Sequence, residues 1–359
     1  MSVSSESNRG GTVAETATRG PLLGSRASVS KGLLTVVIST VGLYILSALF
    51  APTSITAGPQ LSMLAFASVL AIVGLGQMLV VQQGGIDLSV PGAVSLAVVI
   101  ASHQPNGDDS KLFMAVVMAY AFSLVAGFLN GFLVGILRLN PIIATLGTNA
   151  LLFGAVLGIS GGTPRVTTVL LQNIVHGLTW GIPNEVFFVV FITAIVTLVL
   201  KKTAAGRRFE GVGSSGPAAK IVGLRVKTHN SLAYVWAQLL FTTAGVMLAG
   251  VTNQPTAFQG NSYLLPSVAV VVLGGTSLLG GRGLPLATVI AALFLTQLDQ
   301  FVLALGVPFA IRTLVQAAAL GIGVAAYTIN WSSVRMRLKE LLSTLRASDG
   351  NETTSSPPA

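Results

Sequence analysis

The chain has 359 residues, of which 52% are hydrophobic and only 9% are charged. A typical soluble domain carries about 25% charged residues, so this composition nearly excludes a soluble protein of this size. Two long stretches, 32–86 and 228–281, contain no Asp, Glu, Lys or Arg. Together with a mean hydropathy of +0.80, they predict a helical protein that crosses a membrane many times.

Cysteine is absent and there are only three histidines. The absence of cysteine excludes disulfides, thiolate nucleophiles and Cys-based zinc or iron–sulfur sites. His103, His176 and His229 do not have the spacing that puts two imidazoles on one helical face, so we expect no metal and no cofactor. The net charge of +9 lies in loops that flank apolar segments, which indicates membrane topology and not nucleic-acid binding.

Uncharged apolar runs bounded by turn residues predict ten membrane spans. These cover residues 32–50, 61–81, 90–102, 112–137, 142–160, 186–200, 232–250, 262–273, 284–298 and 301–328. Spans 90–102 and 262–273 are short and adjoin glycine-rich turns. Irregular backbone at membrane depth is tolerated only where protein or a water-filled cavity satisfies it. The short spans therefore mark a pathway through the bundle, or else their boundaries lie a few residues further out.

Lysine and arginine are distributed unevenly over the predicted loops. If both termini are inside, 17 of the 20 fall on the inner side, as the positive-inside rule requires. We therefore predict an all-α polytopic membrane protein of about ten helices, N-in and C-in. Residues 1–31 are expected to be a disordered cytoplasmic tail, 32–328 the transmembrane domain, and 329–359 a second cytoplasmic tail.

The longest predicted inner loop, 201–231, carries seven of the Lys and Arg residues. Its centre predicts a short helix, because Pro217 suits a first helical turn and Gly223 suits a helix end. A short helix that projects from a membrane bundle can dock into a groove on a partner. The alternative is a basic tether that only fixes topology.

No site for coupling to ATP is evident within the chain. None of its seven lysines follows a glycine, so it lacks the phosphate-binding loop in which Gly-Lys precedes Ser or Thr. Ionisable groups in or beside the spans are limited to Asp87, Asp299 and Arg312, a thin set for a proton relay. We therefore expect that the chain does not hydrolyse ATP through a phosphate-binding loop.

A Gly-Gly turn followed by a helix-starting proline occurs twice. The first runs from Gln83 to Pro91, and the second from Leu273 to Pro285. A parallel internal duplication would account for both, as in other transporters. Chance recurrence in a chain with 40 glycines is the alternative.

Polar side chains within or beside the apolar runs are the only guide to a pathway. The candidates for pathway or gating residues are Gln77, Asp87, Asn130, Asn149, Gln297 and Gln316. Amides also bind neighbouring helices, and a carboxylate can cap a helix start near Pro91 or bind nearby backbone amides. The sequence therefore leaves two interpretations of these residues open, contact with a neighbouring part of the chain or contact with the substrate. A second pattern, Gly127, Gly131 and Gly135 at helical spacing, predicts close packing of two helices.

Four further motifs follow one another in chain order. They are Gly84-Gly85-Ile86-Asp87-Leu88-Ser89 after Gly76-Gln77; Asn130-Gly131 with Leu139-Asn140-Pro141-Ile142-Ile143-Ala144-Thr145-Leu146-Gly147; Gly206-Arg207-Arg208 with Ala218-Ala219-Lys220-Ile221-Val222-Gly223-Leu224-Arg225-Val226; and Val272-Leu273-Gly274-Gly275-Thr276-Ser277-Leu278-Leu279-Gly280-Gly281-Arg282-Gly283. Together they resemble the permease subunits of bacterial ribose-type (monosaccharide) ABC importers, and the resemblance covers about residues 32–328. Residues Asn140 and Asn149 and the run Ser89-Val90-Pro91-Gly92 depart from the family pattern, which puts the local geometry after Asp87 in question.

The resemblance implies an inner-membrane importer for a monosaccharide or similar small polar solute. Two permease chains, identical or different, would form the path by alternating access. Separate cytoplasmic ABC ATPase subunits would power it, and a periplasmic sugar-binding protein would deliver the solute. By this resemblance the chain itself would be a transport subunit without a nucleotide site, and not an enzyme. The remaining expected partner is membrane lipid, and no nucleic acid is expected.

The resemblance also implies a coupling helix that fits the ATPase and carries Ala218, Ala219, Gly223 and Leu224. The expected ATPase contact comprises Pro217, Ala218, Ala219, Lys220, Ile221, Val222, Gly223, Leu224 and Arg225. Two alternatives stay open at this point. One is a secondary transporter driven by an ion gradient, and the other is a membrane scaffold that transports nothing.

Overall fold

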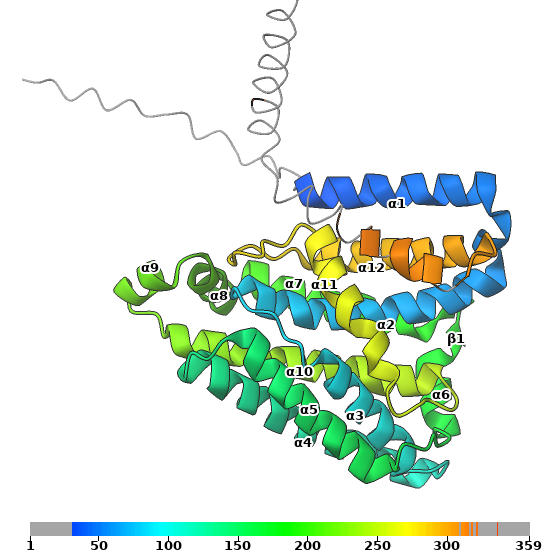
Figure 1. Cartoon of the computed structure of the whole chain (residues 1–359), viewed down its shortest axis with the longest axis horizontal. Helices are drawn as coiled ribbons and strands as arrows, with labels where there is room; N and C mark the ends of the chain where they lie inside the picture. The colour runs from blue at the N-terminus through cyan, green and yellow to red at the C-terminus, as the bar shows by residue number, and fades with distance from the viewer. Residues whose placement is uncertain (1–30, 309, 316, 319–320, 322–335, 337–359) are drawn as a thin grey trace, which may run out of the picture.

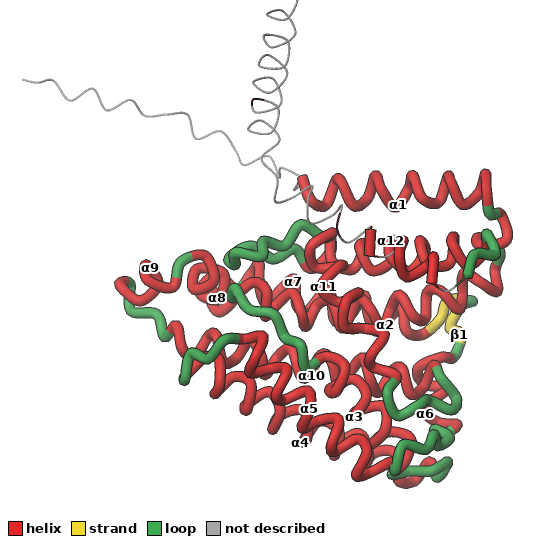
Figure 2. The backbone as a smooth tube through the Cα atoms, in the orientation of Figure 1, coloured by secondary structure: helices red, strands yellow, loops and turns green. Residues whose placement is uncertain are grey.

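The computed structural model describes residues 31–308, 310–315, 317–318, 321 and 336 (Figure 1). The two predicted tails lie outside these residues, apart from Lys31 and Met336. Within the described part, the chain is helical except for one two-stranded hairpin and the connecting loops (Figure 2). This architecture confirms the predicted all-α membrane class.

Seven of the described helices are long and apolar enough to cross a membrane. They are α1 (Lys31–Phe50), α2 (Ala57–Gln82), α4 (Leu112–Asn130), α5 (Pro141–Ser160), α7 (Asn184–Lys202), α10 (Val226–Val251) and α12 (Pro285–Ala304). Helix α4 continues into the π-helix η3 (Gly131–Ile136). Two shorter apolar helices, α3 (Val90–His103) and α11 (Leu264–Leu273), occupy the two short predicted spans.

The remaining elements are short and connect the long helices. They are η1 (Pro52–Ile55), η2 (Asp109–Lys111), α6 (Val169–His176), β1 (Leu178–Thr179), β2 (Ile182–Pro183), α8 (Ala204–Ser214), α9 (Gly216–Ile221) and η4 (Gln259–Tyr263). Strands β1 and β2 pair antiparallel, with Leu178 opposite Pro183. The α8–α9 pair and the β1–β2 hairpin lie at opposite ends of the bundle (Figure 1).

Helix α12 continues across the break that the sequence predicts between residues 298 and 301. A carboxylate within a span must be satisfied locally, and Asp299 meets this condition because its Oδ1 accepts from Arg312 Nε at 2.9 Å. That part of the predicted boundary is therefore wrong. The end of the tenth predicted span, 322–328, lies outside the described residues, so the count of ten and the N-in, C-in orientation stay predictions.

Helix α2 forms the centre of the bundle. Every residue from Ala67 to Gln82 is buried, as expected of a helix that is apolar on all sides and enclosed by others. It packs against α10, α12, α11 and α7. Helix α10 in turn packs against α3 and α4, and α1 covers α12 at one edge (Figure 1).

The predicted glycine stripe lies at the contact of α4 and η3 with α10. A Cβ on Gly127 would lie 2.8 Å from Val235 Cα, and a Cβ on Gly131 would lie 2.6 Å from the Ser231 carbonyl oxygen. No side chain fits at these distances, so the glycines allow the two backbones to approach. The Ser231 hydroxyl donates to the Gly131 carbonyl at 2.7 Å. The prediction of close helix packing is confirmed.

Candidate coupling site and buried polar centre

Helix α9 is the predicted short helix, and its ends follow the local sequence signals. The hydroxyl oxygen of Ser215 accepts from the Ala218 N–H at 3.3 Å, and Pro217 occupies the first turn. Gly223 ends the helix with φ = +80°, in the left-handed region that favours glycine. The Leu224 N–H donates to the Ala219 carbonyl at 2.9 Å, which closes the C-terminal turn.

The outer surface of α9 is exposed and ends in large apolar side chains. Ile221 is 88% exposed and Val222 is 73% exposed. Apolar side chains that stand free on a surface mark an interaction site when they are grouped. Of the nine residues in the expected ATPase contact, Ala219 is buried and Leu224 is half-buried, so these two face the chain itself. The exposed members are Pro217, Ala218, Lys220, Ile221, Val222, Gly223 and Arg225.

Helix α8 attaches α9 to the bundle. Lys201 Nζ lies 3.0 Å from Glu210 Oε1, which ties the end of α7 to α8. Gln83 Nε2 donates to the Phe209 carbonyl at 2.9 Å. A Cβ on Gly213 would overlap the Gln82 carbonyl oxygen, so the α8 backbone rests directly on the end of α2.

The two Gly-Gly turns meet at this same place. The Gly281 N–H donates to the Gln82 carbonyl at 2.8 Å, and Gln82 Nε2 donates to the Gly281 carbonyl at 3.0 Å. Gly280 and Gly281 have φ values of +92° and +84°, which disfavour any other residue. We call the contact among Gln82, Gly213, Gly280 and Gly281 the glycine junction. It joins both turns to α8.

A cluster of buried polar side chains surrounds the turn between α2 and α3. We call it the polar centre; its members are Gln77, Asp87, Ser89, Asn130 and Gln238, all fully buried. Asp87 Oδ1 accepts from the Ser89 N–H at 2.8 Å and from the Ser89 hydroxyl at 2.5 Å. Asn130 Nδ2 and Gln238 Nε2 donate to Ser89 Oγ at 2.9 and 2.6 Å.

The backbone of this turn is also held from several helices. With its amide oriented to satisfy both groups, Gln77 donates to the Asp87 carbonyl at 3.2 Å and accepts from the Asp87 N–H at 3.3 Å. Thr145 Oγ1 of α5 accepts from the Leu88 N–H at 2.9 Å. Helices α2, α4, α5 and α10 thus fix the turn that precedes α3. This geometry favours a structural role for Asp87, as an acceptor of neighbouring backbone and hydroxyl groups.

The departures from the family pattern contact one another or cap a helix. Asn149 Oδ1 accepts from the Gly92 N–H at 2.8 Å. A Cβ on Gly92 would lie 2.7 Å from Leu152 Cβ, so the glycine lets α3 approach α5 closely. Asn140 caps α5, because its Oδ1 accepts from the Ile142 N–H at 2.9 Å. The geometry after Asp87 is therefore well defined, with Pro91 in the first turn of α3.

Gln297 lies outside the polar centre. Gln297 donates to Ser47 Oγ at 3.1 Å and accepts from Gln60 Nε2 at 2.8 Å, which ties α12 to α1 and α2. Gln316 lies outside the described residues. Sequence reasoning missed Gln238, although it is an amide within an apolar run and meets the same criterion as Gln77. Ser89 and Thr145 carry no comparable signal, since hydroxyl residues are common in apolar spans.

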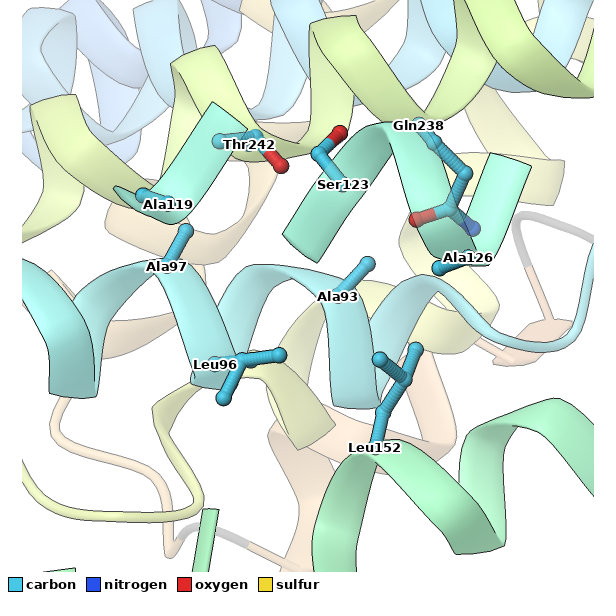
Figure 3. Close-up of a pocket in the computed structure, with 9 residues that line it drawn as sticks. All are labelled: Ala93, Leu96, Ala97, Ala119, Ser123, Ala126, Leu152, Gln238 and Thr242. Atoms are coloured by element: carbon cyan, nitrogen blue, oxygen red, sulfur yellow. The ribbon is translucent and has the colours of Figure 1, made fainter. Parts of the chain in front are cut away.

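A cavity of about 10 Å³ lies beside the polar centre, among α3, α4, α5 and α10 (Figure 3). Small side chains dominate its lining, which comprises Ala93, Leu96, Ala97, Ala119, Ser123, Ala126, Leu152, Gln238 and Thr242. Such a volume holds about one water molecule, whereas small-molecule sites measure roughly 300–1,000 Å³. The polar centre does not open here into a chamber that fits a sugar.

Within the described part of the chain, no group of three or more His, Asp or Glu side chains could hold a metal ion. The chemistry at the polar centre is hydrogen bonding among amides, hydroxyls and one carboxylate. The surface of α9 offers apolar contact beside the exposed charges of Lys220 and Arg225. The arrangement is suited to docking at α9 and to holding the turn between α2 and α3.

Comparison with known proteins agrees with this architecture. Residues 60–322 match the family described as branched-chain amino acid transport system / permease component. The chain is 33% identical over 270 residues to a ribose import permease protein of Bacillus subtilis, covering 74% of this chain and 83% of the relative. It is 32% identical over 245 residues to an autoinducer 2 import system permease protein of an Enterobacter species, covering 68% and 71%.

A fructose import permease protein of Bifidobacterium longum is 30% identical over 257 residues, covering 70% of this chain and 72% of the relative. No solved structure matches the chain significantly. The helical bundle and these matches define a multi-pass inner-membrane permease, a transport component and not an enzyme. The chain belongs to the family of permease subunits of ribose-type, monosaccharide ABC importers, a family that implies ATPase and periplasmic binding-protein partners.

Proposed function

We propose that this chain forms the membrane path of an ABC importer for a monosaccharide or similar small polar solute. Separate ATPase subunits power it by docking on α9. The observation that carries the proposal is the exposed apolar end of α9, formed by Ile221 and Val222. The relatives are described as permeases for ribose, autoinducer 2 and fructose, which supports a sugar or sugar-like solute delivered by a periplasmic binding protein.

The proposed orientation puts both termini in the cytoplasm. The positive-inside rule supports it, because residues 201–231 carry seven Lys and Arg residues. Helices α8 and α9 then face the ATPase subunits. The β1–β2 hairpin, at the opposite end of the bundle (Figure 1), then faces the binding protein.

The proposed mechanism is alternating access driven through α9. A change of ATPase state shifts the permease only if α9 binds the ATPase differently in its two conformations. Movement of α9 would reach α8, and from α8 it would reach the end of α2 through the Gln83–Phe209 bond and the glycine junction. Asp87 lies four residues beyond Gln83, so the polar centre and the start of α3 are next in line.

The solute path is proposed to lie between two permease chains, identical or different. The small size of the cavity beside the polar centre supports this, because it leaves no room for a sugar there. Gln77, Asp87, Asn130 and Asn149 surround the start of α3. We propose a gating role for these four through the position of α3, and keep Gln297 and Gln316 as pathway candidates.

Co-purification from detergent-solubilised membranes tests ATPase docking. The variant Ile221→Glu/Val222→Glu places two charges on the exposed end of α9, and it should lose the ATPase subunit that the wild-type chain retains. Both side chains are exposed, so the bundle itself should fold normally. Trp180→Glu is the matched control, because Trp180 is 89% exposed in the hairpin at the other end.

The control should retain the ATPase. If neither the wild type nor Trp180→Glu recovers an ATPase, the ABC mechanism fails for this chain. Uptake abolished by an uncoupler alone would then support a gradient-driven carrier. Equal loss from both variants would show that α9 is not the docking helix.

A further inference from the structure

A groove of about 470 Å³ opens between α7 and α10. Both helices pack against α2, whose Leu79 forms the floor of the groove. Phe209 of α8 lines one end, and Val199 and Trp236 lie along its walls. The lining is apolar over nearly its whole length, except for His229 at the α8 end and Thr243 at the other.

Two exposed cations, Lys202 and Arg208, lie close in sequence to residues that line the α8 end of the groove. Along α7, the lining residues Ile195 and Val199 are four residues apart, and Lys202 follows Val199 by three, which extends the same helical face. On α8, Arg208 follows the lining residue Ala205 by three and immediately precedes Phe209. Lys202 and Arg208 are exposed, and neither forms an ion pair within the described residues.

We infer that this groove binds an anionic phospholipid. An acyl chain would lie along the apolar walls, and the phosphate headgroup would contact Lys202 and Arg208. Basic pockets between membrane helices bind anionic headgroups in this way. A helix of a second copy would fill the apolar length, but it would leave the two cations without a partner, so charge complementarity favours the lipid.

A lipid bound in this groove would support the helices that connect α9 to the bundle. Phe209 lines the groove, and its carbonyl accepts from Gln83, so a bound lipid supports α8 where α8 meets the end of α2. Anionic lipid would then stabilise the position of α9. This consequence, and the location in the inner leaflet, rest on the proposed function and orientation, whereas lipid binding itself does not.

Native mass spectrometry of the purified full chain tests the inference. The probes are phosphatidylglycerol and phosphatidylcholine with identical acyl chains. Wild type should retain phosphatidylglycerol in preference, and Lys202→Gln/Arg208→Gln should weaken that retention about thirtyfold. The matched control is Lys220→Gln/Arg225→Gln, which removes the same charge from exposed positions at α9.

A second variant, Ile195→Trp, fills the groove without changing its charge and should abolish retention of both lipids. Equal losses in the two charge variants, or full retention by Ile195→Trp with an unchanged unfolding temperature, would overturn the inference. A wild-type dimer that is dissociated by Ile195→Trp, with no lipid preference, would assign the groove to a second copy. Loss of ATPase co-purification with lipid retention intact would refute the proposed function and leave this site standing.

Discussion

Replacing Gly213 with valine will destabilise the bundle by about 1–3 kcal/mol, the usual cost of forcing a side chain into a packed site. A Cβ at this position overlaps the Gln82 carbonyl oxygen and lies 3.0 Å from the Gly281 nitrogen. Both obstacles are backbone atoms, so no side-chain rotation relieves them. Helix α8 must move away from α2, and we expect a lower unfolding temperature in detergent together with weaker ATPase recovery.

Gly211→Val is the control for this experiment. Gly211 lies on the same helix and is exposed, and a Cβ there meets nothing within 4 Å. The two variants share the same change in helix propensity, so their difference reports the contact alone. Equal unfolding temperatures for the two variants would show that the glycine junction does not hold α8.

We also expect Asp87→Ala to lower the stability of the bundle strongly. This change removes the acceptor for the Ser89 N–H and hydroxyl, which donate to Asp87 Oδ1 at 2.8 and 2.5 Å. Each buried donor left unpaired costs about 1–3 kcal/mol, so we expect a loss of about 3 kcal/mol. Asp87→Asn should recover part of the stability, because its Oδ1 still accepts from both groups, while its Nδ2 cannot accept from Gln238 Nε2, which donates to Oδ2 at 3.4 Å in the wild type.

Thermal unfolding in detergent measures the stability of Asp87→Ala and Asp87→Asn. Asp109→Ala is the control. Asp109 is exposed, and its carboxylate accepts from the Leu170 N–H at 3.0 Å, so its removal should have a small effect. An Asp87→Ala variant as stable as Asp109→Ala would refute the structural role. Normal stability but abolished uptake in Asp87→Asn would instead assign a transport role to the charge.

Local sequence signals were sufficient to predict helix α9 and its two ends. Proline fits the first helical turn and glycine fits the end, and these two preferences are properties of single residues. They do not determine which side of so short a helix faces the chain. Ala219 is buried and Ile221 is exposed because of how α9 packs on its neighbours, and that requires the three-dimensional structure.

Contacts between distant segments could not be derived from the sequence. The two Gly-Gly turns show their similarity in sequence, but the bonds between Gln82 and Gly281 join residues about 200 positions apart. Asn149 and Gly92 were noted only as departures from a pattern. The structure explains both at once, because the amide of Asn149 binds the Gly92 N–H in the space that the missing side chain leaves.

The predicted span boundary was wrong where an ion pair neutralises a charged residue within a helix. A carboxylate near the end of an apolar run predicts a loop, yet Asp299 continues α12 because Arg312 neutralises it. Helix α6 and the β1–β2 hairpin were missed for a related reason. They are short, and their stability comes from contacts with neighbouring helices and not from a periodic pattern.

Site-directed cross-linking tests the central claim most directly, and the chain is well suited to it because it has no cysteine of its own. A Val222→Cys variant carries one reactive thiol at the exposed end of α9. In native membranes, a short thiol-to-amine cross-linker should join this position to an ATP-binding subunit, while Trp180→Cys at the opposite end should give no such product. Cross-linking of the ATP-binding subunit to position 180 and not to position 222 would contradict both the orientation and the assignment of α9 as the coupling helix.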